Sequence, residues 1–147
     1  MRIKSPKLGE VEFSDKEVLD FPEGLYGFEH LKRFILIEGG KKSLFSYLQS
    51  IDDENVTFII ANPAEIIKGY SIDIEQSEYD SLQIKDKEML ADFVIVTIPE
   101  NIEDISVNLL GPVIINCRTN KGKQVISKNT DYSTKHNILN ELQKMAS

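Results

Sequence analysis

The chain has 147 residues, 41% of them hydrophobic, and a formal net charge of −7. Its longest apolar runs, Phe34–Ile37 and Phe93–Ile98, are far shorter than the roughly 20 residues of a membrane-spanning helix. The basic N-terminus has no apolar stretch behind it, and one cysteine, Cys117, forms no internal disulfide. These features exclude a membrane protein and a disulfide-stabilised secreted protein, and they predict a cytoplasmic one.

The charge is unevenly distributed along the chain. The segment Ser71–Asp104 holds ten acidic residues and two lysines, whereas residues 111–147 hold six bases and two acids. An acidic middle repels a phosphate backbone, so we expect no direct binding to nucleic acid. The acidic residues either serve solubility alone or face a basic partner, and the sequence leaves both interpretations open.

The first predicted elements are a hairpin and a shaped loop. Val11–Phe13 and Lys16–Leu19 predict an opening β-hairpin that turns at Ser14-Asp15. The next segment, Asp20–Glu29, combines two glycines and a proline with large apolar side chains, a mixture that regular strands and helices do not tolerate. We expect a loop anchored in the core, with a partner-contacting apolar patch as the alternative. The anchoring side chains would be Phe21, Leu25 and Phe28.

Short strands dominate the remainder. Tyr70–Glu75 alternates apolar and polar residues, which predicts a half-buried strand. Three β-branched runs predict more deeply buried strands: Val56–Ile60, Phe93–Ile98 and Val113–Ile115. Asn120–Lys123 followed by Gln124–Ile126 predicts a second hairpin. Frequent glycine and proline between these runs favour an antiparallel barrel or sandwich.

Helical patterns are few. Ser77–Leu82 predicts one helical turn. Ser133–Leu142 predicts a short C-terminal helix within residues 133–147, because its apolar residues fall on one helical face. The expected fold class is therefore mainly β: a single-domain antiparallel β-barrel-like fold over residues 1–147 with a short C-terminal helix.

We find no pattern typical of catalysis, metal binding or cofactor binding. His30 and His136 lie in no ligand or catalytic motif. Gly24 and Gly27 lack the remaining residues of a phosphate-binding loop. Cys117 follows a predicted strand and is interpreted as a small buried residue. The sequence thus predicts a protein that is not an enzyme and has no cofactor and no metal.

Four groups of segments carry a resemblance to a known family. They are Phe21–Glu29; Phe45–Asp52 followed by Phe58–Pro63; Asn108–Asn116; and Gly122–Ile126 with Tyr132–His136 downstream. In this order the set resembles the flagellar assembly factor FliW family over nearly the whole chain. The chain departs from the family pattern at Tyr26, Asn62 and Gly111, where proline, aspartate and alanine are common.

The resemblance implies a small cytoplasmic bacterial protein with a barrel-like fold and no catalytic activity. Such a protein binds flagellin before export and also binds the translational repressor CsrA, and the two partners compete. When flagellin leaves, the factor captures CsrA away from its RNA-binding surface and relieves repression allosterically. We also expect a monomer when free, with no membrane partner. The alternative is an unrelated small β-domain, either a binding module or an enzyme whose site is assembled from scattered residues.

Nine residues are candidates for partner binding: Tyr47, Leu48, Gln49, Asp73, Glu75, Glu78, Asp80, Asn108 and Pro112. Tyr47, Leu48 and Gln49 fit a core or a surface equally well. Asn108 suits either the closing of a turn or a place in the binding surface. The four acids belong to a hypothesis that Ser71–Asp104 lowers the affinity of bound CsrA for RNA by charge repulsion.

Overall fold

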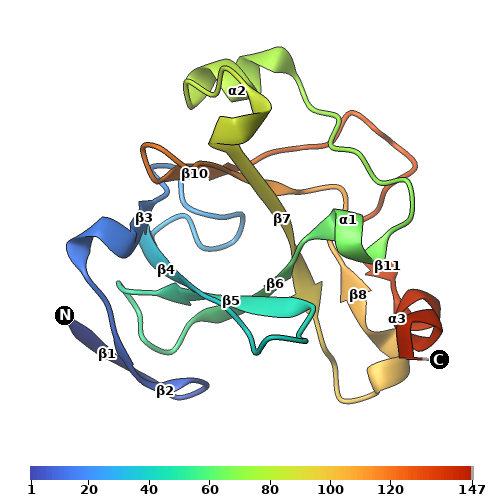
Figure 1. Ribbon diagram of the computed structural model, residues 1–147, viewed down its shortest axis with the longest axis horizontal. Coiled ribbons are helices and arrows are strands. Elements are labelled where there is room, and N and C mark those ends of the chain that lie inside the picture. The colour runs from blue at the N-terminus through green and yellow to red at the C-terminus, as the bar shows by residue number, and fades with distance from the viewer. Residues whose placement is uncertain (147) are drawn as a thin grey trace.

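The computed structural model describes residues 1–146, and its centre is a closed barrel of seven strands (Figure 1). Around the ring these are β3 (Val18–Asp20), β4 (Arg33–Ile37), β5 (Phe45–Ser50), β6 (Thr57–Ala61), β7 (Leu90–Thr97), β9 (Val113–Asn116) and β10 (Lys121–Gln124). Neighbouring strands run antiparallel, except that β10 meets β3 through one parallel bridge, Lys121 to Asp20. The expectation of a mainly β, barrel-like fold is confirmed.

Strand β7 closes the barrel because it changes partner along its length. Its first half pairs with β9 and its second half with β6. Its last residues also pair with β8 (Ser106–Val107), which continues outside the ring to β11 (His136–Asn137). Since side chains alternate along a strand, Ala91, Phe93 and Ile95 point into the barrel core and Leu90 and Val94 pack outside it.

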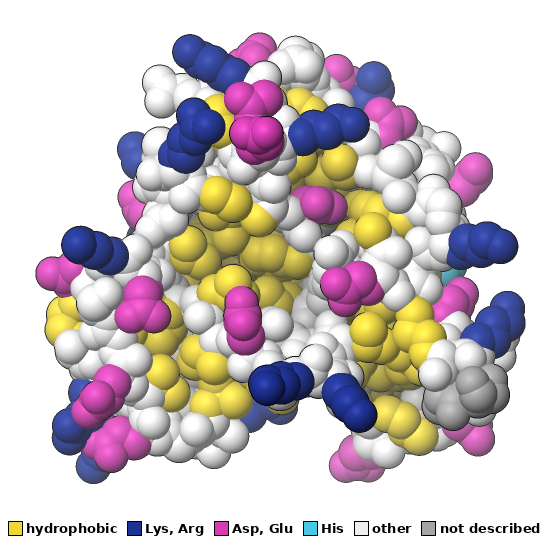
Figure 2. All heavy atoms as spheres, in the orientation of Figure 1, with side chains coloured by type: hydrophobic (Ala, Val, Ile, Leu, Met, Phe, Trp, Pro, Cys, Tyr) yellow, Lys and Arg dark blue, Asp and Glu magenta, His cyan; other side chains and the backbone are white. Residues whose placement is uncertain are grey.

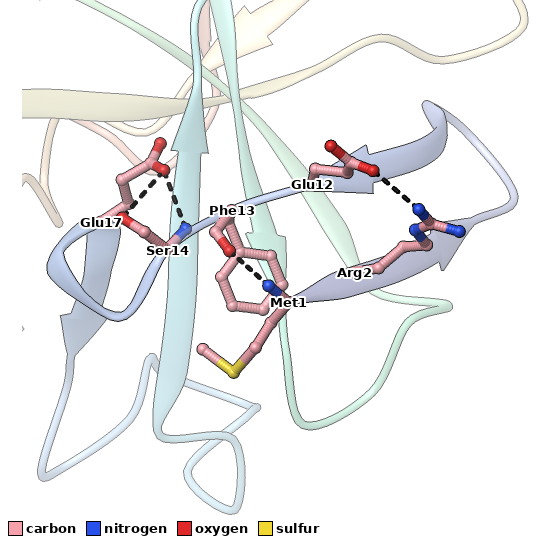
Figure 3. A pocket seen from close by; sticks show the side chains of 6 residues that line it. All are labelled: Met1, Arg2, Glu12, Phe13, Ser14 and Glu17. Atoms are coloured by element: carbon pink, nitrogen blue, oxygen red, sulfur yellow. Dashed lines mark hydrogen bonds and ion pairs between the residues drawn. The ribbon is translucent and has the colours of Figure 1, made fainter.

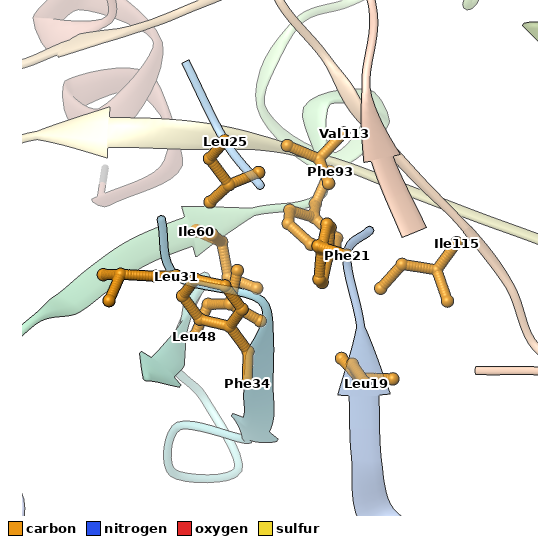
Figure 4. Packing of buried hydrophobic residues seen from close by; sticks show 10 residues of the cluster. All are labelled: Leu19, Phe21, Leu25, Leu31, Phe34, Leu48, Ile60, Phe93, Val113 and Ile115. Atoms are coloured by element: carbon orange, nitrogen blue, oxygen red, sulfur yellow. The ribbon is translucent and has the colours of Figure 1, made fainter. Parts of the chain in front are cut away.

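The loop between β3 and β4 fills the barrel interior (Figure 4). Phe21 and Leu25 are at most 1% exposed, and the Phe21 ring meets Phe34 edge-on at 5.3 Å between centroids. Phe28 packs edge-on against Phe58 at 5.0 Å. The core-anchoring interpretation of this loop is confirmed. The buried members of this core are Leu19, Phe21, Leu25, Leu31, Phe34, Leu48, Ile60, Phe93, Val113 and Ile115.

Two positions must be glycine because a side chain there would collide with residues of this loop. Gly24 has a φ of +69°, and a Cβ there would lie 2.6 Å from the Glu29 Cα. Gly122 lies within β10, where a Cβ would lie 2.6 Å from the Phe21 ring. The predicted second hairpin therefore exists between β9 and β10, but its turn precedes Lys121 and Gly122 belongs to a strand.

The opening hairpin was predicted at the wrong place. Strand β1 (Arg2–Ser5) pairs with β2 (Gly9–Glu12), and Ser14 instead caps a 3-10 turn at Asp15–Glu17. This capping satisfies the backbone locally and separates β2 from β3. The β1–β2 hairpin lies beside the barrel, where Ile3 and Phe13 pack against Ile35 of β4.

Two apolar clusters cover the outer face of β7. The α2 cluster lies under α2 (Gln76–Ser81) and comprises Ile74, Leu82, Ile84, Met89, Ile114 and Val125. The α3 cluster lies near α1 (Pro63–Ile66) and α3 (Leu139–Ala146) and comprises Ala61, Ile66, Val94, Val96, Ile105, Val107, Leu109 and Ile138. Further 3-10 turns occupy Lys87–Met89 and Ile102–Asp104.

Two predicted elements differ from the structure in these outer layers. Tyr70–Glu75 alternates in burial but forms no strand ladder, because it crosses the outside of the barrel as the connection from α1 to α2. The C-terminal helix begins at Leu139 rather than Ser133, since residues 136–137 pair with β8 and the Asn137 side chain accepts a hydrogen bond from the Leu139 amide at 3.0 Å. Residue 147 of the expected helix lies outside the described residues.

Candidate partner-binding surfaces

Three of the predicted partner-binding residues are buried. Leu48 and Gln49 are 0% exposed, and Pro112 lies buried just before β9. The Gln49 amide nitrogen donates to the carbonyl oxygen of Glu54 at 3.1 Å, and its amide oxygen accepts from the Thr57 hydroxyl. These side chains hold the barrel together and present no surface to a partner, so we leave them out of the proposed surfaces.

Asn108 closes a turn, as one interpretation of the sequence predicted. Its side-chain oxygen accepts a hydrogen bond from the Gly111 amide at 2.8 Å. Gln124 then joins this turn to the loop after β3: its nitrogen donates to the Gly111 carbonyl at 3.0 Å, and its oxygen accepts from the Tyr26 amide at 2.9 Å. Two segments that carried the family resemblance are thus held in register by one buried glutamine.

The remaining predicted residues lie in two separate regions. Tyr47 is half-buried on β5, with the Lys7 ammonium 6.0 Å from its ring centroid, and β5 lies across the barrel from α2 in Figure 1. The acidic residues lie on α2 and just before it. Of these, Asp73, Glu75 and Asp80 are exposed.

Glu78 differs from its acidic neighbours because it has a cationic partner. Its carboxylate lies 2.7 Å from the Lys123 ammonium, which is also 3.4 Å from Glu23. The hydrogen bond to Glu78 raises the pKa of Lys123. Since Lys123 offsets its charge, Glu78 adds less negative potential to this surface than the three exposed acids do.

A groove of about 540 Å³ lies between the α2 cluster and the α3 cluster. Figure 2 shows hydrophobic side chains gathered on the surface between α2 and α1. The groove is lined by Ala64, Tyr70, Ser71, Ile72, Gln76, Tyr79, Ile84, Lys85, Asp86, Lys87, Leu90 and Asp92. We call this the outer groove. Its apolar lining and open shape suit a segment of another protein better than a small polar ligand.

Asp92 is the most unusual residue of the outer groove. It lies on the outer face of β7, between Leu90, which packs against the α2 cluster, and Val94 of the α3 cluster. Burial raises the pKa of its carboxyl group, against a smaller lowering by its own backbone amide. No ion pair to Asp92 is formed by the residues that the structure describes.

Two tyrosines line the groove together with this carboxylate. Burial, and next to it the negative charge of Asp92, raise the pKa of both Tyr70 and Tyr79, so their hydroxyl groups stay protonated. Tyr70 is held in place by stacking on Tyr132, with 5.7 Å between ring centroids. The groove therefore combines apolar side chains with the Asp92 carboxylate, which has no cationic partner among the described residues, and two tyrosine hydroxyl groups.

Sequence reasoning missed this groove. Asp92 was counted only as one of ten acids in its segment. The available signal was a single carboxylate inside an otherwise apolar run from Leu90 to Val96, an arrangement that places a charge on a largely covered strand.

Other hollows open elsewhere on the molecule. One, of about 350 Å³, lies at the β4–β5 connection, with Ile60 and Phe93 among its lining residues. Another, of about 460 Å³, lies between β1 and the turn after β5, with Ile3 and Asp52 among its lining residues. A further hollow, of about 590 Å³, lies beside the N-terminus (Figure 3). In it the Met1 nitrogen donates to the Phe13 carbonyl at 2.8 Å, and Arg2 pairs with Glu12 at 2.8 Å. Its polar groups already bond to one another, which gives a ligand few free contacts.

The histidines and the cysteine lie far apart in the described part of the chain. Over residues 1–146, no group of three or more His, Cys, Asp or Glu side chains is placed to hold a metal ion. His30 is exposed and His136 is half-buried in β11. Cys117 is exposed, so the expectation that it is buried was wrong: it begins the turn after β9, outside the barrel. No described helix is long and apolar enough to span a bilayer.

Comparison with known proteins gives consistent matches. Residues 2–138 match the family described as FliW protein. The chain is 37% identical over 142 residues to the flagellar assembly factor FliW of Natranaerobius thermophilus, covering 96% of this chain and 94% of that protein. It is 38% identical over 143 residues to that of Thermoanaerobacter pseudethanolicus, covering 97% and 95%. A crystal structure of the flagellar assembly factor FliW superposes with a TM-score of 0.85 at 32% identity, covering 94% of this chain and 96% of that one.

Proposed function

The chain belongs to the FliW family of flagellar assembly factors, and we propose that it works in the cytoplasm by binding two proteins in turn, flagellin and CsrA. While flagellin awaits export, it occupies the factor. Once flagellin is exported, the released factor binds CsrA away from the RNA-binding surface and relieves repression of flagellin synthesis.

The observation that carries this proposal is the extent of the family match. It spans residues 2–138, and the segments that resemble the family converge on one barrel through Gln124 and the loop after β3. The outer groove adds an open, partly apolar surface of the kind that protein partners use.

The proposal is tested with a complex of CsrA and RNA from the flagellin messenger, both from the bacterium that encodes this chain. Adding the protein should release fluorescently labelled RNA, and prior addition of flagellin should prevent the release. If the protein binds neither flagellin nor CsrA at tens of micromolar, the proposal is wrong. If the protein binds both partners without competition between them, the switching mechanism is wrong, but the proposed binding of both partners stands.

Charge repulsion between the acidic surface and RNA is a second, separable part of the proposal. Asp73, Glu75 and Asp80 are exposed, so their field reaches solvent and is screened over about 10 Å at 0.1 M salt. Neutralising them to the matching amides should weaken RNA displacement at low salt while CsrA still binds. Neutralising Glu78 alone should change displacement less, because that carboxylate is paired with Lys123.

A matched control separates this local field from net charge. The triple variant Asp15→Asn, Glu38→Gln and Asp131→Asn removes the same number of exposed acids from outside Ser71–Asp104. It should displace RNA as the wild type does. Unchanged displacement by the Asp73, Glu75 and Asp80 variant at low salt, with CsrA still bound, would show that repulsion plays no part.

A further inference from the structure

We propose that the outer groove is the docking site for a segment of a partner protein that carries apolar side chains next to a lysine or arginine, and that Asp92 binds the basic side chain. The inference rests on the proposed function, because it assigns to the binding of a protein partner the surface that holds it.

The first argument is incomplete burial of the apolar lining. Ile72, Tyr79 and Leu90 pack against the α2 cluster and Tyr70 packs against the α3 cluster, yet all four remain only partly buried. They are the side chains at the gap between the two clusters. An apolar segment laid in the gap would complete their burial, at about 25 cal/mol for each Å² removed from water.

The second argument is charge complementarity at one defined point. The Asp92 carboxylate is half-buried between Leu90 and Val94 on the outer face of β7, where a charge without a partner is unfavourable. Lys85 and Lys87 are exposed on the groove rim, and within residues 1–146 neither forms an ion pair with Asp92. A cation delivered by a partner would meet Asp92, with the Tyr70 and Tyr79 hydroxyl groups nearby to bond polar backbone atoms.

The surroundings of the groove favour the same occupant. The charged residues of the groove lining, Lys85, Asp86, Lys87 and Asp92, balance one another, whereas Asp73, Glu75 and Asp80 are exposed on and just before α2 beside the groove. This wider acidic surface attracts a basic chain and repels an acidic one. A bare metal ion is a poor alternative, because the described residues near Asp92 supply no group of three carboxylate, histidine or cysteine ligands. A peptide segment that is both basic and apolar would bury the apolar lining of the groove and pair with the Asp92 carboxylate at the same time.

The test compares isosteric variants of the full chain. The dissociation constants for purified flagellin and for CsrA are measured by calorimetry for the wild type, Asp92→Asn and the control Asp15→Asn, an exposed acid on the 3-10 turn beside β3. For the partner that docks in the groove, Asp92→Asn should weaken binding at least tenfold, whereas Asp15→Asn should stay within twofold. The melting temperature of Asp92→Asn should not fall, which excludes unfolding as the cause.

A second pair of variants tests the apolar floor. Ile72→Ala should weaken the same partner several-fold, and Ile102→Ala, an isoleucine that is 53% exposed in the turn before β8, should not. Far-ultraviolet circular dichroism confirms that each variant is folded. Agreement between the Asp92 and Ile72 variants on the same partner is required, because the inference assigns both residues to one site.

The outcomes distinguish the groove from the wider function. If the wild type binds flagellin and CsrA, and both groove variants bind them within twofold, the groove inference is wrong and the proposed function stands. If the wild type binds neither protein, both fall. If instead the wild type dimerises in sedimentation and Asp92→Asn abolishes the dimer, the occupant is a second copy of this chain and the assignment to another protein is wrong.

Discussion

The two faces of strand β7 differ in how completely this chain covers them. Toward the barrel, Ala91, Phe93 and Ile95 meet the loop after β3 and the opposite strands. Away from the barrel, Leu90 and Val94 are covered by separate clusters, and Asp92 between them lies in an open groove. The side chains on the inner face are buried by other parts of the same chain, whereas some on the outer face stay partly exposed. The residues that stabilise the fold are therefore different from those available to bind a partner.

The largest effect should come from the inner face. Phe21→Ala removes a fully buried ring that packs on Phe34 and over Gly122, and should lower the free energy of unfolding by about 3–5 kcal/mol. Urea denaturation followed by circular dichroism measures this. Tyr26→Ala, at the exposed tip of the same loop, is the control and should cost less than about 1 kcal/mol. Equal losses in the two variants would show that the loop does not pack as described.

A smaller loss should follow at Gln49. In Gln49→Ala the carbonyl of Glu54 and the hydroxyl of Thr57 lose a buried partner, which should cost about 1–3 kcal/mol. Because Gln49 is 0% exposed, the affinity of the folded variant for flagellin and CsrA should not change. A loss of affinity at unchanged stability would instead assign Gln49 to a binding surface that opens when a partner binds.

The same contrast explains which features could be predicted from sequence. The strands β6, β7 and β9 could be predicted because a run of neighbouring β-branched and apolar residues is enough to indicate a buried strand. Gly122 was interpreted as part of a turn because its actual constraint, the Phe21 ring, comes from a hundred positions earlier. Tyr70–Glu75 has the alternation of a strand, but whether a segment finds a hydrogen-bonding neighbour is decided by the rest of the chain.

The outer groove could not be predicted from the sequence either, because residues far apart in the chain form it. Its lining comes from α1, α2, β7 and the connections between them, so no local pattern contains it. The four acids predicted as partner-binding residues were chosen for their charge alone. The structure shows that Glu78 is paired with Lys123, whereas Asp92, which was not singled out, lies on the outer face of β7 and forms no ion pair with the described residues.

On the outer face, Asp92→Asn should raise stability rather than lower it. Burial raises the pKa of this carboxyl group, so the folded state holds its proton more tightly than the unfolded state does, and stability falls as pH rises through the pKa values of the two states. At pH 7 the amide should therefore be more stable by about 1 kcal/mol, at the low end of the cost of an unsatisfied polar group.

The sign can be checked by repeating the urea denaturation of wild type and Asp92→Asn across pH. The advantage of the amide should be present at neutral pH, should shrink as the pH falls through the raised pKa of the folded Asp92 carboxyl group, and should be gone below the pKa of an unfolded aspartate, about 3.9. Tyr70 and Tyr79 remain protonated throughout this range, because their pKa values are raised. An advantage that stays constant with pH would mean that the carboxylate charge is not its source.

The smallest effect should come from an outer position with no groove around it. Cys117 is exposed in the turn between β9 and β10, so Cys117→Ser should change the free energy of unfolding by no more than about 0.5 kcal/mol. Its thiol should react with a thiol reagent in the native protein as fast as in urea. A slow native reaction would place the thiol inside the fold. A fast one, with affinity for both partners retained after labelling, would show that this part of the exterior is open without serving recognition, in contrast to the groove beside Asp92.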